Sequence, residues 1–460
     1  MAHPQPGWCR SNDARHADPE HLRGRGSPEG VGVQARRSQL TYQQALDFIS
    51  KQGRFAMKLG TERTRAILDR LGAPDRELRG ALIAGTNGKG STGACLTSIL
   101  RAAGHGVGFM PKPHLVSYTE RIELNGSPIS KGDFVATLEA LMPTLDEVAS
   151  EMGPATEFEM LTAMAIAYLA PRIELLVCEV GLGGRLDATN ALDLGIAVIT
   201  NVDLDHQKYL GNTIGEIARE KAAIIKHGNR VVTGCEGEAL AIVEAQADAM
   251  AAQVWRLGRD VIVDAISLGW GGHELSVRGP DFAHRDLRLP LVGDYQPANA
   301  ALAVAAARLL GVVGDDAIRE GLASTNWPGR LQVIGQHPRV IVDGGHNPAA
   351  MVKAGTALRR LIGSEKLVAV FGMLSERDPV KLLGALRTMR PDAVVFTEAT
   401  SAQGHAIAPE NLATLYGPDA YVAPSARAAI DMARELAGPS GNVLVGGSLY
   451  LVGEVLSLKD

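Results

Sequence analysis

Short runs of consecutive apolar residues alternate, over most of the chain, with longer stretches whose apolar positions recur every three or four residues. The short runs predict buried strands, and the longer stretches predict amphipathic helices. Because strands separated by helices are covered on both faces, this order favours parallel sheets of an α/β fold. The predicted strands are Ala81–Ala84, Leu175–Glu179, Ile196–Thr200, Arg230–Thr233, Val340–Val342, Lys366–Phe371, Ala393–Thr397 and Asn442–Val445.

Two segments depart from this alternation. Residues 1–39 are rich in Gly, Pro, His and Arg without apolar periodicity, which predicts a disordered tail or a start site assigned too early rather than a targeting peptide. Folded structure is expected from residue 40, because Thr41 and Gln44 form a capping-box pattern ahead of a helical stretch. Between Val254 and Leu291, short polar-interrupted runs predict antiparallel strands at the edge of an α/β sheet.

The composition is that of a globular protein, with 46% hydrophobic and 21% charged residues. Lys and Arg total 46 against 51 Asp and Glu, for a net charge of −5, which argues against a protein that coats nucleic acid or an anionic membrane. Four cysteines without a C-x-x-C spacing fit reduced thiols, and no apolar stretch reaches the length of about 18 residues that a membrane span needs. We therefore expect a cytoplasmic protein with no nucleic-acid or membrane partner.

A glycine-rich turn follows the first predicted strand and reads G-T-N-G-K-G-S-T over residues 85–92. A strand, a glycine turn and a helix start together hold phosphate, because backbone N–H groups and the helix dipole face the anion and Lys89 adds a cation. The run departs from G-x-x-x-x-G-K-[ST], since Ile83 occupies the first glycine position and Gly90 separates Lys89 from the hydroxyls. It predicts a nucleotide-phosphate site with Ser91 placed to reach Mg²⁺. A glycine turn without a ligand is the alternative.

Three further polar residues follow predicted strands or lie just beyond them. Glu179 ends a strand, His206 follows the next strand, and Lys221 lies on the helical stretch after it. Singly they fit a salt-bridge partner, a surface histidine and a solvated lysine. Because ligand chemistry in open α/β sheets lies at the carboxyl ends of strands, the three side chains could also converge beside the phosphate loop.

These motifs together resemble the Mur ligase superfamily, and specifically its folate branch of dihydrofolate synthase and folylpolyglutamate synthase. The resemblance runs from about Leu40 to the C-terminus and rests on residues 85–92, on E-V-G-L-G-G-R-L-D-A-T-N from Glu179, and on D-H followed by L-G-N-T-I-G-E-I-A-R-E-K up to Lys221. P-G-R at 328–330 and D-G-G-H-N-P at 343–348 extend it, although the second run alone also fits an ordinary strand-to-helix turn.

The resemblance implies a fold and a set of site residues. It implies a P-loop, mainly parallel-sheet ATPase domain at residues 40–326, followed by a smaller Rossmann-like α/β domain at 327–460; Pro and Gly near residue 327 fit this boundary. Lys221 would be carbamylated, and His346 would approach the phosphates from the second domain beside a cationic Arg330. The implied ATP-binding residues are Asn87, Gly88, Lys89, Gly90, Ser91, Asn299, Arg330 and Asp343; the Mg²⁺ ligands are Ser91, Glu179 and His206; the catalytic residues are Lys89, Lys221 and His346.

The resemblance also implies a pterin site. Its residues would be Thr156, Glu157, Phe158, Glu159, Leu186, Asp187 and Ala188, although Thr156 and Glu159 equally form a capping-box pattern. One position departs from the family, because Lys112 stands in M-P-K-P-H-L where the family has a serine that ligates Mg²⁺. An ammonium cannot ligate a metal, so either phosphates, Ser91, Glu179 and water hold the ion, or Lys112 supplies its own charge.

We expect an ATP-dependent ligase that adds glutamate to dihydropteroate and to reduced folates through an acyl phosphate, with ATP and Mg²⁺ as cofactors. We expect this enzyme to be monomeric. Three alternatives stay open from the sequence. The chain could be a folylpolyglutamate synthase alone, a Mur-type ligase for another carboxylate, or a nucleotide-binding regulatory protein without ligase chemistry, and only Lys112 favours the last.

Overall fold

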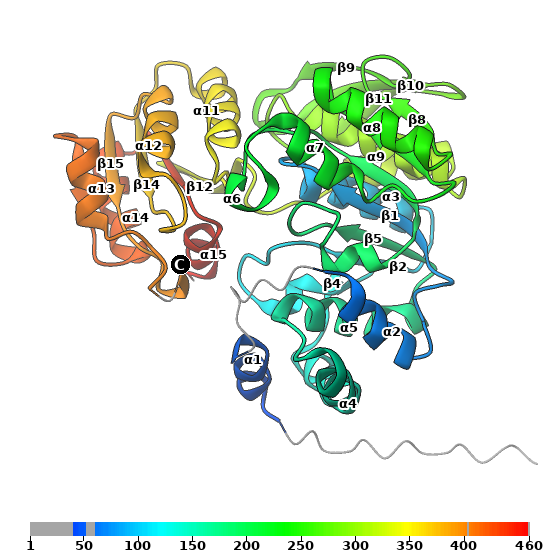
Figure 1. Cartoon of the computed structure of the whole chain (residues 1–460). Helices are drawn as coiled ribbons and strands as arrows, with labels where there is room; N and C mark the ends of the chain where they lie inside the picture. The colour runs from blue at the N-terminus through cyan, green and yellow to red at the C-terminus, as the bar shows by residue number, and fades with distance from the viewer. Residues whose placement is uncertain (1–39, 52–59, 403, 459–460) are drawn as a thin grey trace, which may run out of the picture. The chain divides into compact units, whose positions relative to one another are not determined.

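The computed structural model describes residues 40–51, 60–402 and 404–458, so the predicted tail at 1–39 lies outside the described residues. Eight strands form one sheet in the first part of this chain (Figure 1): β1 (Arg79–Ala84), β2 (Val107–Met110), β3 (Glu123–Leu124), β4 (Ser127–Pro128), β5 (Leu175–Glu179), β6 (Gly195–Ile199), β7 (Arg230–Thr233) and β8 (Gln253–Arg256). Their order is β4-β3-β2-β5-β1-β6-β7-β8, and β2 to β8 along it are parallel while β3 and β4 pair antiparallel. The α/β prediction and the strands β1, β5, β6 and β7 are confirmed, whereas β2 was not predicted.

Helices cover both faces of this sheet. One group consists of α1 (Tyr42–Lys51), α2 (Glu62–Arg70), α4 (Lys131–Met152), α5 (Glu157–Leu169), α7 (Ile214–Ala222) and α8 (Gly237–Ala249), and the other of α3 (Lys89–Ala102), α9 (Gln296–Leu310) and α10 (Asp315–Ala323). Successive residues of β1 point to opposite faces, so Leu82 packs in the first core and Ile83 in the second. A strand buried on both faces needs apolar residues at consecutive positions, which explains the uninterrupted apolar runs.

The prediction for Val254–Leu291 is wrong in part. β8 runs parallel to β7 in the large sheet. The next three strands, β9 (Ile262–Ser267), β10 (His273–Gly279) and β11 (Phe282–Leu289), are antiparallel as predicted, but they form a separate sheet rather than an edge of the large one. Alternate residues of β10 are buried in the core that α9 and α10 share. The polar interruptions therefore mark the exposed face of a sheet that is covered on one side only.

A second α/β sheet occupies the C-terminal part of the chain. Its strands are β12 (Gln332–Gly335), β13 (Arg339–Val342), β14 (Leu367–Phe371), β15 (Ala393–Phe396), β16 (Ala420–Val422) and β17 (Asn442–Gly446), in the order β12-β13-β17-β14-β15-β16. All neighbours are parallel except β12, which pairs antiparallel with β13. The helices α11 (Pro348–Ile362), α12 (Pro379–Thr388) and α13 (Pro409–Tyr416) share one core, and α14 (Ala426–Ala437) and α15 (Leu449–Ser457) share the other.

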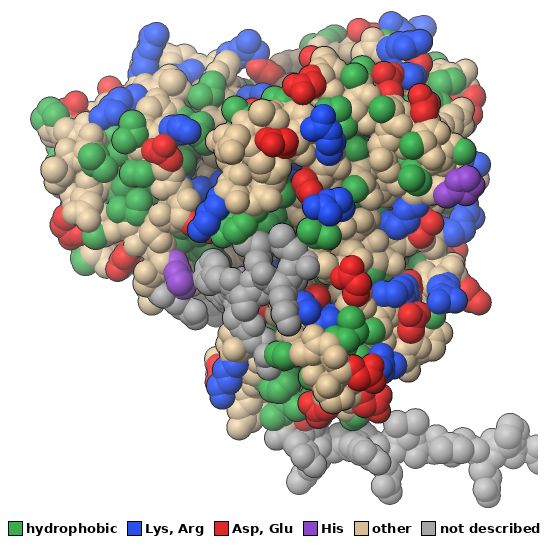
Figure 2. Space-filling view, in the orientation of Figure 1, with side chains coloured by type: hydrophobic (Ala, Val, Ile, Leu, Met, Phe, Trp, Pro, Cys, Tyr) green, Lys and Arg blue, Asp and Glu red, His purple; other side chains and the backbone are tan. Residues whose placement is uncertain are grey.

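The short elements and the surface complete the description. The remaining helical turns are α6 (Gln207–Leu210), η1 (Tyr118–Arg121), η2 (Ala170–Arg172), η3 (Ala188–Ala191), η4 (Gly269–Gly271) and η5 (Thr400–Ala402). Acidic and basic side chains are intermixed on the face that Figure 2 shows. Among the described residues, no helix is both long enough and apolar enough to cross a membrane.

Candidate active site

The phosphate loop joins β1 to α3 and is held by hydrogen bonds from the neighbouring strand end. Thr86 N–H donates to Asn201 O at 2.9 Å, and Asn87 N–H donates to Asn201 Oδ1 at 3.0 Å. Gly88, the N-cap of α3, has a φ of +87°, and the Asn299 side chain occupies the place that a Cβ would need there. A residue with a side chain is thus excluded twice at Gly88, by strain and by space. The loop is ordered for a ligand that binds to the start of α3.

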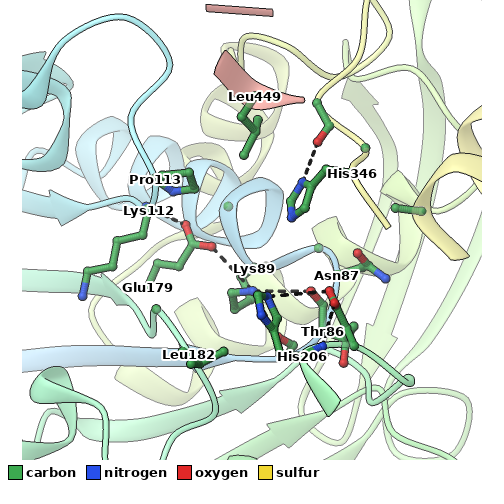
Figure 3. Close-up of a pocket in the computed structure, with 18 of the residues that line it drawn as sticks. Thr86, Asn87, Lys89, Lys112, Pro113, Glu179, Leu182, His206, His346 and Leu449 are labelled. Carbon is green, nitrogen blue, oxygen red and sulfur yellow. Dashed lines mark hydrogen bonds and ion pairs between the residues drawn. The ribbon is translucent and has the colours of Figure 1, made fainter. Parts of the chain in front are cut away.

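One cavity of about 400 Å³ joins the phosphate loop to loops of the C-terminal sheet (Figure 3). Every residue predicted for ATP, metal or catalysis lines it: Asn87, Gly88, Lys89, Gly90, Ser91, Glu179, His206, Lys221, Asn299, Arg330, Asp343 and His346. These residues come from seven stretches that are far apart in the sequence. Their convergence could not be derived from spacing, and it makes the cavity the candidate active site.

Glu179 is a buried carboxylate at the carboxyl end of β5. Its Oε2 accepts the backbone N–H of Lys112 at 3.0 Å, and its Oε1 lies 3.9 Å from Lys89 Nζ. Burial raises the pKa of Glu179, and the Lys89 charge opposes that rise. Because the nearest cation is 3.9 Å away, the negative charge of this buried carboxylate is only partly neutralised. A further cation at Oε1 would therefore be favourable.

The fit to Mg²⁺ is therefore partial. Among the described side chains, no three His, Cys, Asp or Glu gather closely enough to hold a metal by themselves. One carboxylate and the Ser91 hydroxyl are, however, what an ion that arrives with nucleotide phosphates requires, because Mg²⁺ keeps water and phosphate oxygens as its other ligands. His206 fits less well, since its Nε2 lies 3.3 Å from Arg377 Nη2 and would have to exchange that neighbour for a metal.

Arg377 belongs to a cluster that the sequence did not predict. It pairs with Asp205, whose other oxygen accepts from Asn347 Nδ2 at 2.9 Å, and Asn347 also donates to Asn87 Oδ1 at 3.0 Å. These bonds join the loop after β6 and the phosphate loop to two loops of the C-terminal sheet. Arg377 lies between β14 and α12, beyond the carboxyl end of a parallel strand. This position could have identified it as a candidate site residue.

Lys221 reaches the phosphate loop from α7. It is 4% exposed, and its Nζ donates to Gly85 O at 3.1 Å, an oxygen that also accepts from Lys89 Nζ at 3.0 Å. Burial, together with the Lys89 charge, lowers the pKa of Lys221 to about 7. Near neutral pH a large fraction of this amine is consequently unprotonated and nucleophilic.

His346 lines the cavity beside Arg330 as an uncharged ring. Burial and the Arg377 charge lower its pKa to about 4, so the ring is neutral at neutral pH. Its Nδ1 lies 2.9 Å from Gly344 O, which can only accept, so Nδ1 carries the proton and Nε2 carries a lone pair. Arg330 is thus the cation of this pair, and His346 Nε2 is an acceptor for a hydrogen bond.

Asp343 lines the cavity and joins the two C-terminal motifs. Its Oδ1 accepts from Gly345 N–H at 2.8 Å and its Oδ2 from Leu331 N–H at 3.0 Å. Burial raises the pKa of Asp343, and the Arg330 charge and these two hydrogen bonds oppose the rise. This geometry fixes the turn that carries Arg330 next to the turn that carries His346.

The predicted pterin residues are only partly brought to the cavity. Phe158 lines it, whereas Thr156, Glu157, Glu159, Leu186, Asp187 and Ala188 are not among its lining residues. Thr156 and Glu159 form the capping box of α5, and Glu159 also pairs with Arg63 at 3.0 Å. Asp187 accepts from Gly181 and Leu182, two backbone N–H groups of the cavity wall. The capping interpretation is confirmed, and direct binding by these six residues stays a prediction.

A phosphate-loop α/β sheet and a second α/β sheet that contributes cations to the same cavity are the arrangement of a class of ligases. Comparison with known families agrees with this class. Residues 83–307 match the Mur ligase middle domain, and residues 329–449 match the Mur ligase glutamate ligase domain. The chain belongs to the Mur ligase family, in the branch that contains dihydrofolate synthase/folylpolyglutamate synthase.

Three relatives show how far the likeness extends. A dihydrofolate synthase/folylpolyglutamate synthase of Bacillus subtilis is 35% identical over 76% of this chain and 83% of its own length. A structure of the Mycobacterium tuberculosis folylpolyglutamate synthase complexed with ADP and AMPPCP has a TM-score of 0.85 at 32% identity, covering 91% of this chain and 98% of that one. A probable bifunctional folylpolyglutamate synthase/dihydropteroate synthase of Haloferax volcanii is 36% identical over 90% of this chain, which spans 50% of that relative's length.

Proposed function

We propose that the protein is an ATP-dependent ligase that forms an amide between glutamate and the carboxylate of dihydropteroate or a reduced folate, releasing ADP and phosphate. The carrying observation is that Lys89, Glu179 and Lys221 share one cavity with Arg330 and His346 of the C-terminal part. In this proposal residues 40–326 bind the nucleotide and residues 327–460 complete the site. The names of the relatives support the choice of substrates.

The first step transfers a phosphoryl group. The acceptor carboxylate attacks the γ-phosphate of ATP, the bond between that phosphorus and the bridging oxygen breaks, and an acyl phosphate and ADP result. Negative charge spreads over the transferred group, so Lys89, the amides at the start of α3 and Arg330 stabilise it electrostatically. No covalent bond to the enzyme is needed, and positioning supplies the remaining acceleration.

Ser91, Glu179 and His206 are the residues that would hold Mg²⁺, which when bound neutralises phosphate charge. In the same proposal the Lys221 amine takes up CO₂: the nitrogen lone pair bonds to carbon, one proton leaves, and a carbamate replaces a positive charge. Its low pKa and its burial beside Lys89 support this role. The new carboxylate would remove one of two adjacent cations at Gly85 O.

The second step forms the amide. The glutamate amine attacks the acyl carbon, phosphate leaves, and the nitrogen loses one proton. The departing phosphate takes this proton, and His346 Nε2 would accept a hydrogen bond from the attacking amine, because its Nδ1–H is bound to Gly344 O and its Nε2 is unprotonated. Arg330 would hold the departing phosphate.

Product mass tests the proposal directly. Purified protein is incubated with ATP, Mg²⁺ and glutamate, and dihydropteroate and tetrahydrofolate are offered separately. One added glutamate residue on either acceptor supports the ligase, and addition to both makes it bifunctional. Lys89→Ala should abolish ADP formation, while Lys366→Ala, at an exposed lysine outside the cavity, should not. Absence of product from both acceptors, or turnover that survives Lys89→Ala, would contradict the proposal.

A further inference from the structure

Lys112 lines the cavity, and its amine has no hydrogen-bond partner among the described residues. Its Nζ lies 3.9 Å from the centroid of the Phe158 ring and is shielded from solvent, and both residues line the cavity. Burial lowers the pKa of Lys112, and the nearby acids, Asp187 above all, oppose that change. An aromatic face compensates a buried ammonium only in part, because three N–H donors remain unused.

The neighbouring carboxylates are already committed to other donors. Asp187 Oδ2 accepts from Gly181 and Leu182 at 3.1 and 3.0 Å, and its Oδ1 accepts from the Thr189 N–H and hydroxyl at 3.0 and 2.5 Å. Glu179 accepts the backbone N–H of Lys112 itself and faces Lys89 with its other oxygen. An oxygen from a ligand is therefore the natural partner of Lys112 Nζ.

The direction of the side chain indicates which oxygen this is. In Figure 3 Lys112 runs from Pro113 away from Lys89 and Glu179, so its amine does not lie where phosphoryl transfer takes place. The reacting carboxylate must lie beside Lys89. Lys112 consequently meets a second group of the acceptor, and the Arg121 guanidinium, which also lines the cavity, adds positive charge there. A site with two cations favours an anionic group.

The two proposed acceptors differ in this respect. Dihydropteroate carries only the carboxylate that reacts, whereas the terminal glutamate of a folate carries a second one a few bonds from the reacting group. We propose that Lys112 Nζ binds this second carboxylate and thereby favours glutamylated folates over dihydropteroate. The inference rests on the ligase function proposed above and names Lys112 as a specificity residue for that reaction.

The test compares KM for the two acceptors in Lys112→Met and Lys112→Arg. For tetrahydrofolate, Lys112→Met should raise KM about tenfold or more, as expected for loss of a charge-assisted hydrogen bond, with kcat much less affected. For dihydropteroate the change should stay within about twofold, and Lys112→Arg should recover most of the tetrahydrofolate affinity. Lys131→Met is the matched control, since Lys131 also lies over an aromatic ring, Tyr42, but outside the cavity.

Equilibrium binding of tetrahydrofolate to the ADP complex gives a second readout that does not depend on turnover. It should weaken in Lys112→Met by the same factor as KM rises. Equal losses for both acceptors, or no loss for tetrahydrofolate, would overturn the assignment. If Lys112→Met does not fold, as judged by circular dichroism, Lys112→Gln makes the same comparison. Absence of product from both acceptors with the unaltered protein would instead refute the proposed function itself.

Discussion

The ion pair between Asp205 and Arg377 predicts a measurable coupling between the two parts of the site. Both side chains are largely buried, with 9% and 15% exposure, and Asp205 also accepts from Asn347. Asp205→Asn keeps the size of the side chain and removes its charge. We expect the variant to unfold at lower urea concentration, because a guanidinium would remain in a mostly buried place without a counter-charge.

The magnitude follows from the Asp205 carboxyl. Burial alone would raise its pKa, but the charges of His206 and Arg377 outweigh this and lower the pKa from 3.8 to about 2. That difference corresponds to about 2.4 kcal/mol of stability at neutral pH. His206 itself has a pKa of about 4 and is uncharged there, so Arg377 supplies only part of this sum. The expected loss of unfolding free energy is about 1–2 kcal/mol.

A double-mutant cycle isolates this interaction. The free energy of unfolding in urea is measured for the unaltered protein, Asp205→Asn, Arg377→Met and the double variant, and the coupling energy should be about 1–2 kcal/mol. Because the Asp205 pKa is depressed, the pair contributes fully above about pH 4, and the coupling should be constant from pH 8 to about pH 5. Asp264→Asn is the control, since Asp264 pairs with Arg278 at the surface with 68% and 63% exposure and should change stability by less than about 0.5 kcal/mol. A cycle with no coupling, or an equal effect in the control, would refute the reasoning.

Three further outcomes are expected. A Cβ at Gly90 would lie 2.5 Å from Trp327 Cζ2, so Gly90→Ala should reduce ADP formation about tenfold or more. Adding Trp327→Leu to this variant should restore part of the ADP formation. No recovery in the double variant would show that the clash is not the cause. The pKa of about 7 at Lys221 predicts that isotopically labelled bicarbonate at pH 8 yields a carbamate signal in carbon NMR, and that this signal is absent in Lys221→Met. A fully active protein that shows no carbamate signal would exclude the carbamate. The pKa of His346 is lowered to about 4, so its neutral form stabilises the fold above pH 6.5 and this stability is lost as the pH falls toward 4. Over this range the free energy of unfolding in urea should fall by at most about 3 kcal/mol more for the unaltered protein than for His346→Gln. Parallel pH profiles of the two proteins would contradict the assignment.

The fold and the contiguous motifs could be predicted from local sequence patterns, whereas the features that were missed depend on contacts between residues far apart in the sequence. The run before the phosphate loop predicts β1 correctly, because a strand buried on both faces has to be apolar at every position. β2 was missed since Val107–Met110 contains a glycine, which interrupts the apolar run. Arg377 was missed for another reason: its partner Asp205 is 172 residues away, and no local pattern reports such a pairing.

The acceptor motif shows why a residue's role cannot be taken from its motif alone. Thr156 and Glu159 stand in the pattern expected both of a substrate site and of a helix cap, and their oxygens are used by the cap and by Arg63. Phe158, between them in the sequence, lines the cavity. The capping box therefore fixes the helix start that carries Phe158, and Phe158 is the residue of this motif that lines the cavity.

The charges of the cavity explain why its lysines differ in character. Among the described residues, seven Lys and Arg side chains line it against four Asp and Glu: Lys89, Lys112, Arg121, Lys221, Arg330, Lys353 and Arg377 against Glu179, Asp205, Asp343 and Glu376. Burial and repulsion from Lys89 lower the pKa of Lys221, as the proposed carbamate formation requires. A nucleotide polyphosphate entering this cavity relieves the same repulsion. The crowding of cations that lowers the pKa of Lys221 thus also favours the binding of anionic ligands, and neutralising Lys89 should alter both.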